Sequence, residues 1–256
     1  MQLVLSLFPG AGLLDRGFEQ AGFCVVRGPD MLLGQRIEEF HATAGHFAGV
    51  IGGPPCQDFS RARRRPPTGY GLQMLTEFAR CVTEAQPDWW LMENVPCVPS
   101  LVIHGYSVQR FNLDARECGL NQRRNRSFQF GSRDGVPLCP NRSTQSHCRK
   151  PAATVMAKDA RAKFSRLCVL QGLPGQYDLP GLSRTAKIRA VGNGVPVPMA
   201  KVVAEAIRDR AVTQQRLCIC GCGRELGHNA KQVTATAACR KRIQRSRDRV
   251  TTASHT

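Results

Sequence analysis

The stretch LVLSLFPGAGLLDRG, residues 3–17, decides the fold. Its first six residues are a short apolar run that stops at Pro9-Gly10, which is typical of a buried parallel strand. Helical spacing follows as far as Gly22. Gly10 and Gly12 let the backbone turn tightly between the two elements, and the helix start offers free N–H groups. This unit predicts either a nucleotide-like cofactor site or a turn that only packs a strand on a helix.

The same alternation continues along the chain. Apolar runs at 23–30, 49–55 and 89–95 predict three further strands, and residues 74–85 predict a helix between the last two. A final helix is predicted within residues 195–211, opened by prolines. Residues 132–185 are richer in Arg, Ser, Pro and Gly and have weak periodicity. The pattern predicts an α/β fold with a doubly wound sheet.

Charge and cysteine content indicate the partner and the compartment. The net charge is +17 and the pI is about 10.0, which favours a polyanion such as nucleic acid over a merely well-solvated surface. Eight of the twelve cysteines are scattered singly before residue 213, which indicates free thiols in a reducing compartment. The N-terminus lacks a basic leader, and no apolar stretch reaches the ~20 residues of a membrane helix. We therefore expect a cytoplasmic protein with no membrane partner.

Cys56 has an unusual setting in IGGPPCQDFS, residues 51–60. Pro54 and Pro55 fix φ and lack N–H donors, so the residue that follows them projects from a stiff arm. Ligands of open α/β sheets bind at the carboxyl ends of the strands, where Cys56 falls. A thiol in that position can act as a nucleophile, whereas a cysteine that only packs in the core would not need two glycines and two prolines before it.

Five motifs together resemble the cytosine-C5 DNA methyltransferase family. They are Phe8-Pro9-Gly10-Ala11-Gly12, Pro54-Pro55-Cys56-Gln57, Glu93-Asn94-Val95, Gln122-Arg123-Arg124-Asn125-Arg126 and Val191-Gly192-Asn193-Gly194-Val195. Their order and approximate spacing match the family over residues 3 to 210. The resemblance implies a Rossmann-like S-adenosylmethionine-dependent methyltransferase fold, in a compact, phage-like member.

The resemblance assigns the chemistry to four residues. Cys56 would add as a thiolate to cytosine C6, so that C5 becomes nucleophilic. Protonated Glu93 would hydrogen-bond N3 and the exocyclic amine of the ring. Arg126 would hold O2, and Arg124 would contact a backbone phosphate or help to position the loop.

The resemblance also implies residues for the two ligands. Asp30, at the end of the second predicted strand, can accept hydrogen bonds from ribose hydroxyls of S-adenosylmethionine. The other expected cofactor residues are Phe8, Gly10, Gly12, Pro54, Asn193 and Val195. Double-stranded DNA is expected to contact Gln57, Ser60, Arg63 and Gln122, with residues 61–71 as a mobile loop.

The chain departs from the family in two stretches and has a short recognition segment. Ala48-Gly49 stand where family members commonly carry an acidic residue before the glycines of the third predicted strand. Gly34-Gln35-Arg36-Ile37 has no aspartate where family members carry one that contacts the adenine amine. We assign residues 1–131 and 186–212 to a catalytic domain and residues 132–185 to a small target-recognition region. Because that region is short, we expect a short or loosely specified target site.

The tail, residues 213–256, is rich in Cys and Arg. Cys218, Cys220, Cys222 and Cys239 can supply tetrahedral thiolate ligands, so we expect a zinc-binding, DNA-contacting knuckle. The downstream half offers one cysteine where two are usual. A disordered basic tail with idle cysteines is the alternative.

The leading hypothesis is a monomeric S-adenosylmethionine-dependent DNA (cytosine-5)-methyltransferase. The alternatives are an RNA cytosine-5 methylase and a DNA-binding regulator whose catalytic body has decayed. All three catalytic groups, Cys56, Glu93 and Arg126, are present, which decay would not be expected to spare.

Overall fold

A computed structural model describes residues 1–60, 63, 66–143, 152–155, 163–212, 236–241 and 244. The chain divides into two compact units, residues 1–208 and residues 209–256. In the second unit, residues 237–241 are helical. The first unit contains the sheet and the sites described below.

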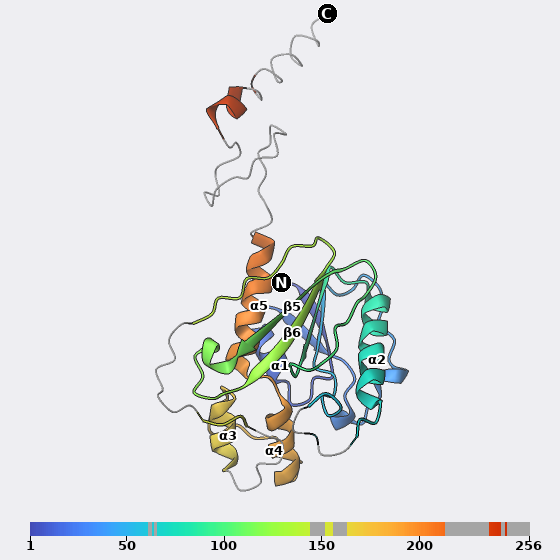
Figure 1. The fold of residues 1–256 in the computed structure, drawn as a ribbon, viewed down its shortest axis with the longest axis vertical. Helices are drawn as coiled ribbons and strands as arrows, with labels where there is room; N and C mark the ends of the chain where they lie inside the picture. Colours follow the sequence, from blue (N-terminus) through green and yellow to red (C-terminus); the bar gives the residue numbers. More distant parts are fainter. Residues whose placement is uncertain are drawn as a thin grey trace, which may run out of the picture. The chain divides into compact units, whose positions relative to one another are not determined.

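The described part of the first unit is built on a six-stranded sheet with the order β2-β1-β3-β4-β6-β5 (Figure 1). Strands β1 to β4 run parallel, whereas β6 is antiparallel to both of its neighbours. The strands are β1 (Leu3–Leu7), β2 (Cys24–Arg27), β3 (Gly49–Gly52), β4 (Trp89–Asn94), β5 (Ser107–Asp114) and β6 (Asn125–Ser132).

Helices connect and cover the strands. The α-helices of the described residues are α1 (Leu13–Gln20), α2 (Tyr70–Ala85), α3 (Phe164–Leu170), α4 (Arg184–Asn193) and α5 (Val197–Val212). Short 3₁₀ turns lie at η1 (Met31–Leu33), η2 (Ile37–Glu39) and η3 (Ala115–Cys118). Every helix among the described residues is too short or too polar to cross a bilayer.

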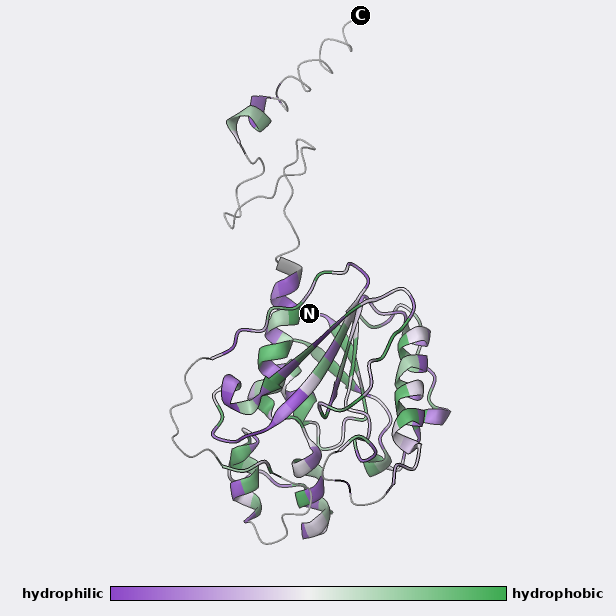
Figure 2. Ribbon diagram, viewed as in Figure 1, coloured by the Kyte–Doolittle hydropathy of each residue, from purple (hydrophilic) through white to green (hydrophobic). Residues whose placement is uncertain are grey.

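Successive strand residues alternate between two cores. Val4 and Trp89 pack with residues of α1 and α5, such as Phe18 and Met199, on one face of the sheet. Leu5 packs on the other face, together with Trp90 and the apolar stripe of α2. Figure 2 shows hydrophobic residues along the strands and on α2 and α5. This period of two places helices on both faces, as the sequence predicts for a doubly wound sheet.

The predicted α/β architecture is confirmed, and the structure adds elements that the sequence pattern did not predict. β5, α3 and α4 lie in segments for which we predicted no regular element. Asn193, which precedes the predicted final helix, is the last residue of α4. The hydrophobic side chains of α4 are few, and Ile188 and Val191 are the ones that it buries.

Close packing of α1 against α5 depends on Gly17. A Cβ atom at this position would lie 2.3 Å from Cβ of Ala200 and 2.6 Å from the backbone nitrogen of Lys201. We predict that Gly17→Ala lowers the free energy of unfolding by about 1–3 kcal/mol, because overpacking outweighs the gain in helix propensity. Urea unfolding checks this, with Gln20→Ala on the exposed side of α1 as the control. Equal stability of Gly17→Ala and wild type would contradict it.

Candidate active site

A cavity of about 630 Å³ opens at the carboxyl ends of β1, β3 and β4. This size is within the range of small-molecule sites. Its walls come from the glycine turn, the end of β2, the corner after β3, the end of β4, the start of β6 and α4. The predicted site residues on its wall are Phe8, Gly10, Asp30, Pro54, Cys56, Gln57, Glu93, Arg126, Asn193 and Val195.

Asn94 holds the corner that carries Cys56. Its side-chain nitrogen donates to the carbonyl oxygen of Pro54 at 3.0 Å, and its side-chain oxygen accepts from the N–H of Val95 at 2.8 Å. Asn94 is buried at the end of β4, next to β3 in the sheet. This hydrogen bond fixes the corner formed by Pro54 and Pro55 against the end of β4. We assigned no role to Asn94 from the sequence, although it belongs to the quoted Glu-Asn-Val motif.

Cys56 is half-buried in the cavity wall. Burial raises the pKa of its thiol above the ordinary value, because the thiolate loses its hydration there, and the Glu93 carboxylate raises the pKa further. Arg126 and Arg124 act in the opposite direction. The resting residue is therefore a thiol at neutral pH.

Glu93 and Arg126 form an ion pair between adjacent strands. Arg126 Nε lies 2.9 Å from Glu93 Oε1, and Glu93 is 6 % exposed. β4 and β6 lie side by side, which brings the two residues together. Burial raises the pKa of Glu93, while Arg126 and Arg124 oppose that shift. The pair and Cys56 face one cavity, as the sequence predicts.

The structure corrects our expectation that Gln122 contacts DNA. Its side chain is fully buried, donates to the carbonyl of Leu170 and to Gln171 Oε1, and accepts from the N–H of Val155. An amide with these internal partners does not face the groove of a DNA duplex. Gln122 instead joins the segment before β6 to α3.

Arg124 is also internal, which corrects the expected phosphate contact but agrees with a positioning role. Its guanidinium donates to the carbonyls of Val155 at 2.7 Å, Gly192 at 2.9 Å and Gly194 at 2.7 Å. The side chain is 1 % exposed, and burial lowers the pKa of its guanidinium to about 9. It therefore connects β6 to the turn between α4 and α5.

The glycine turn and Asp30 form the other end of the cavity. The N–H of Gly10 donates to Asp30 Oδ2 at 2.8 Å, and the N–H of Leu32 donates to Asp30 Oδ1 at 2.6 Å. Phe8 has a positive φ of 54°, a strained value for a non-glycine residue, at the point where β1 enters the turn. Gly12 also has a positive φ, but it begins α1 rather than lining the cavity.

A buried carboxylate supports this turn from within. Asp15 Oδ1 accepts from the Ser6 hydroxyl at 2.5 Å, and Asp15 Oδ2 accepts from Arg27 Nε at 3.0 Å. Burial raises the pKa of Asp15. The three side chains tie β1, α1 and β2 together. We missed them from the sequence, since an acid in the first turn of a helix is common and does not by itself indicate burial.

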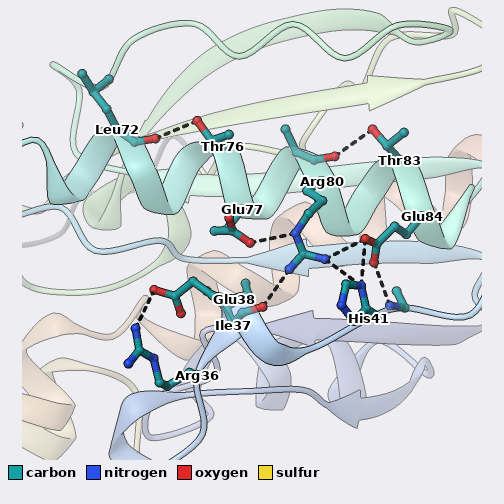
Figure 3. Close-up of polar contacts among 12 residues, drawn as sticks. Arg36, Ile37, Glu38, His41, Leu72, Thr76, Glu77, Arg80, Thr83 and Glu84 are labelled. Carbon is teal, nitrogen blue, oxygen red and sulfur yellow. Dashed lines mark hydrogen bonds and ion pairs between the residues drawn. The ribbon is translucent and has the colours of Figure 1, made fainter.

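The segment without the family aspartate is held by α2 (Figure 3). Arg80 donates to the carbonyl of Ile37 at 2.8 Å and pairs with Glu77 at 2.8 Å and Glu84 at 2.7 Å. Glu84 in turn accepts from the N–H of Ala42. Residues 33–52 contribute nothing to the cavity wall among the described residues. The role of this segment in the structure is to pack on α2.

Asp58 connects the corner after β3, which carries Cys56, to α2. Its carboxylate accepts from the N–H of Gly71 at 2.9 Å, the N–H of Thr68 at 3.0 Å and the Thr68 hydroxyl at 3.1 Å. The two N–H donors lower the pKa of Asp58, which lines the cavity. Arg63 donates to the carbonyl of Asp58. We missed Asp58 because nothing in its sequence neighbourhood identifies its distant partners.

The remaining predicted residues lie outside the cavity wall. Ser60 is half-buried and Arg63 is exposed, both after the corner that follows β3. Cys218, Cys220 and Cys222 lie outside the described residues, so their predicted zinc site is not addressed. Cys239 is described, and its sulfur accepts from the Thr236 hydroxyl at 3.2 Å. The described residues contain no group of metal-ligating side chains.

The chain is similar in sequence to curated proteins that are named Type II methyltransferases. Type II methyltransferase M.HgiDI of Herpetosiphon aurantiacus is 36% identical over 162 residues, which cover 51% of this chain and 52% of that protein. Type II methyltransferase M.MthTI of Methanothermobacter thermautotrophicus is 31% identical over 168 residues, covering 53% and 50%. The chain spans about half the length of the curated relatives it matches.

Solved structures share the fold. A crystal structure of a prophage-encoded protein from E. coli, described as a DNA modification methyltransferase, aligns with a TM-score of 0.63 at 16% identity, covering 83% of this chain and 100% of that one. The methyltransferase EhMeth of Entamoeba histolytica aligns with a TM-score of 0.61 at 10% identity, covering 82% and 99%. The predicted Rossmann-like methyltransferase fold is thus confirmed.

A family model agrees with the geometry of the cavity. Residues 35–167, just over half of the chain, match the model of C-5 cytosine-specific DNA methylases. The matched range includes the corner that carries Cys56, the end of β4 and the start of β6. This chain belongs to the C-5 cytosine-specific DNA methylase family.

Proposed function

We propose that this protein is an S-adenosylmethionine-dependent DNA (cytosine-5)-methyltransferase that acts on a cytosine flipped out of double-stranded DNA. One observation carries the proposal: Cys56, Glu93 and Arg126 face the same cavity that Gly10 and Asp30 line. A nucleophile, an acid with a raised pKa and a cation thus surround the space next to a glycine turn.

The residues at the glycine turn fit the proposed cofactor. Gly10 has open space where a side chain would stand, so a ligand can approach its backbone. The Asp30 carboxylate is a suitable acceptor for ribose hydroxyls, and the apolar Met31 and Leu32 beside it line the cavity. When bound, S-adenosylmethionine supplies an electrophilic methyl group. Pro54, Asn193 and Val195 complete the proposed cofactor residues.

Cys56 performs the central step in this proposal. Its thiol first loses a proton, and the sulfur then forms a bond to cytosine C6, which makes the C5–C6 electron pair available at C5. After C5 gains a methyl group and loses its proton, the sulfur–C6 bond breaks and the ring double bond returns. Cys56 leaves as a thiolate, ready for another cycle.

Glu93 and Arg126 stabilise the charge that develops on the ring. The raised pKa of Glu93 favours a protonated carboxyl that can donate to N3 while cysteine adds. Arg126 lies 2.9 Å from Glu93, and the proposal assigns it to O2 of the ring. Both groups act in a buried site, where electrostatic interactions are less screened by water.

The proposal assigns DNA binding to the charged surface. The net charge of +17 favours a polyanion, and Gln57, Ser60 and Arg63 follow the nucleophile along the chain. We keep residues 132–185 as the proposed target-recognition region, within the first compact unit. Residues 1–131 and 186–212 supply the catalytic residues, and residues 213–256 remain a separate basic tail.

The first prediction tests the reaction itself. With tritiated S-adenosylmethionine and duplex DNA, the wild-type protein should produce 5-methylcytosine, and Cys56→Ala should lose at least 99% of that activity. DNA affinity of Cys56→Ala should stay within about tenfold, because affinity depends mainly on Lys and Arg contacts with phosphates. Nucleoside analysis and filter binding provide the two measurements.

Matched substrates separate the alternatives. Product in a transfer RNA pool but not in DNA would favour the RNA methylase reading. DNA binding without any methylated product would favour the decayed regulator. Residual activity of a few per cent in Cys56→Ala would contradict covalent catalysis by Cys56.

The second prediction concerns the Cys56 pKa. Iodoacetamide should alkylate Cys56 slowly at pH 7 and faster with each step to pH 9.5, because the raised pKa keeps the reactive thiolate scarce until the solution is alkaline. Mass spectrometry of the Cys56 peptide measures the rate, with the exposed Cys24 as an internal reference. A pH-independent rate above that of Cys24 at pH 7 would contradict a raised pKa.

The third prediction concerns Asp58 as a positioning residue. Asp58→Ala should slow single-turnover methylation about tenfold and speed hydrogen exchange at the N–H groups of Thr68 and Gly71, which lose their acceptor. Asp58→Asn keeps one acceptor oxygen and should recover part of both effects. Glu205→Ala on α5, far along the chain from the corner, is the control. Unchanged exchange at both amides in Asp58→Ala would refute the assignment.

A further inference from the structure

One face of α4 forms a wall of the cavity. Ala186, Arg189, Ala190 and Asn193 all line it, at positions separated by three, four and seven residues from Ala186. That spacing places them on one side of an α-helix. From the sequence we assigned a role only to Asn193. Arg189 is the charged residue of this face.

Arg189 has no hydrogen-bond or ion-pair partner within the part of the chain that the structure describes, and its side chain is exposed. Its neighbour on the helix, Lys187, is 2.5 Å from Asp178. The other arginine on the cavity wall, Arg126, is paired with Glu93. Arg189 therefore brings an uncompensated positive charge to the cavity.

The acids on the cavity wall are already bound to other groups. Asp30 accepts from Gly10 and Leu32, Asp58 accepts from Thr68 and Gly71, and Glu93 pairs with Arg126. Ala186 and Ala190, which flank Arg189 on its face of α4, are too small to cover its guanidinium. An anionic ligand entering the cavity can therefore reach Arg189 directly.

We propose that Arg189 binds a backbone phosphate of the DNA at the mouth of the cavity, beside the nucleotide whose base reaches Cys56. This inference rests on the proposed function. A guanidinium matches a phosphate with two parallel N–H donors. Arg189 then acts as a positioning residue, since it fixes the strand from the wall formed by α4.

The position of Arg189 along α4 favours phosphate over the carboxylate of the cofactor. The Asn193 end of α4 lies against the start of α1, directly after the glycine turn, because a Cβ on Gly194 would be 2.8 Å from Cδ2 of Leu13. Arg189 precedes Asn193 by about one helical turn, roughly 6 Å along the axis. Its exposure also places it nearer to solvent than to the enclosed end of the cavity.

The test compares Arg189→Ala, Arg189→Lys and the control Lys201→Ala. Lys201 is a half-buried cation on α5 that lies 3.8 Å from Glu205, it does not line the cavity, and its loss changes the net charge equally. Fluorescence anisotropy with a mixed-sequence DNA duplex, in the presence of S-adenosylhomocysteine, gives the dissociation constant from 50 to 300 mM salt. Calorimetry gives the affinity of each variant for S-adenosylhomocysteine alone.

For Arg189→Ala we expect about tenfold weaker DNA binding at 100 mM salt and a log–log salt slope that is shallower by about 0.9, the contribution of one phosphate. Arg189→Lys should recover the slope but only part of the affinity, because lysine lacks the planar fork. Lys201→Ala should match the wild-type protein. Affinity for S-adenosylhomocysteine should stay within twofold in every variant.

Two results would overturn the inference. An unchanged salt slope in Arg189→Ala would show that Arg189 binds no phosphate. A loss of more than fivefold in S-adenosylhomocysteine affinity, with the slope unchanged, would assign Arg189 to the cofactor carboxylate instead. Failure of the proposed function is distinct from both, since it appears as the absence of methylation by the wild-type protein whatever the slope of Arg189→Ala.

Discussion

The buried guanidinium of Arg124 is the contact on which the geometry of the site depends. It binds the carbonyls of Gly192 and Gly194, at the turn between α4 and α5, and also the carbonyl of Val155. Gln171 contributes a second bond to Gly194 and one to Val191. Removing one partner of such a buried network leaves polar groups without hydrogen bonds, at a cost of about 1–3 kcal/mol for each. Arg124 therefore holds the α4 wall against the strand that carries Arg126.

The same arrangement determines the electrostatics of the cavity. Arg124 and Arg126 both favour the charged forms of Cys56 and Glu93, whereas burial favours the neutral forms and has the larger effect. The resting site thus combines a protonated nucleophile with an acid whose pKa is raised. In the proposed reaction, entry of a polar base and a cationic cofactor would change the surroundings of every one of these groups. The protonation of Cys56 and Glu93 would therefore be coupled to ligand binding.

Much of the site was predictable because it lies at the ends of strands. Apolar runs that stop at Pro9-Gly10, at Gly52-Gly53 and at Glu93-Asn94 indicate parallel strands, and parallel strands end at one edge. That rule places Cys56, Glu93 and Asp30 at this edge, and the resemblance to the family supplies the roles of Cys56 and Glu93. Arg126 follows from the apolar run after it, which becomes β6. Gln122 and Arg124 share its alternation, yet their side chains are internal, because they donate to the carbonyls of Leu170 in α3 and Gly192 in α4.

The sequence by itself determined the alternation of strands and helices, the order of the five motifs and the three groups proposed to carry out the chemistry. The alternation is encoded locally, through periodicity, glycine turns and proline corners, whereas the roles of the three groups come from the resemblance of the five motifs to the family. Only the tertiary structure decided which polar residues are internal supports and which face the cavity. Asp58 meets Thr68 and Gly71, Asn94 meets Pro54, and Arg189 meets no partner among the described residues, because such contacts depend on how distant segments pack rather than on local pattern.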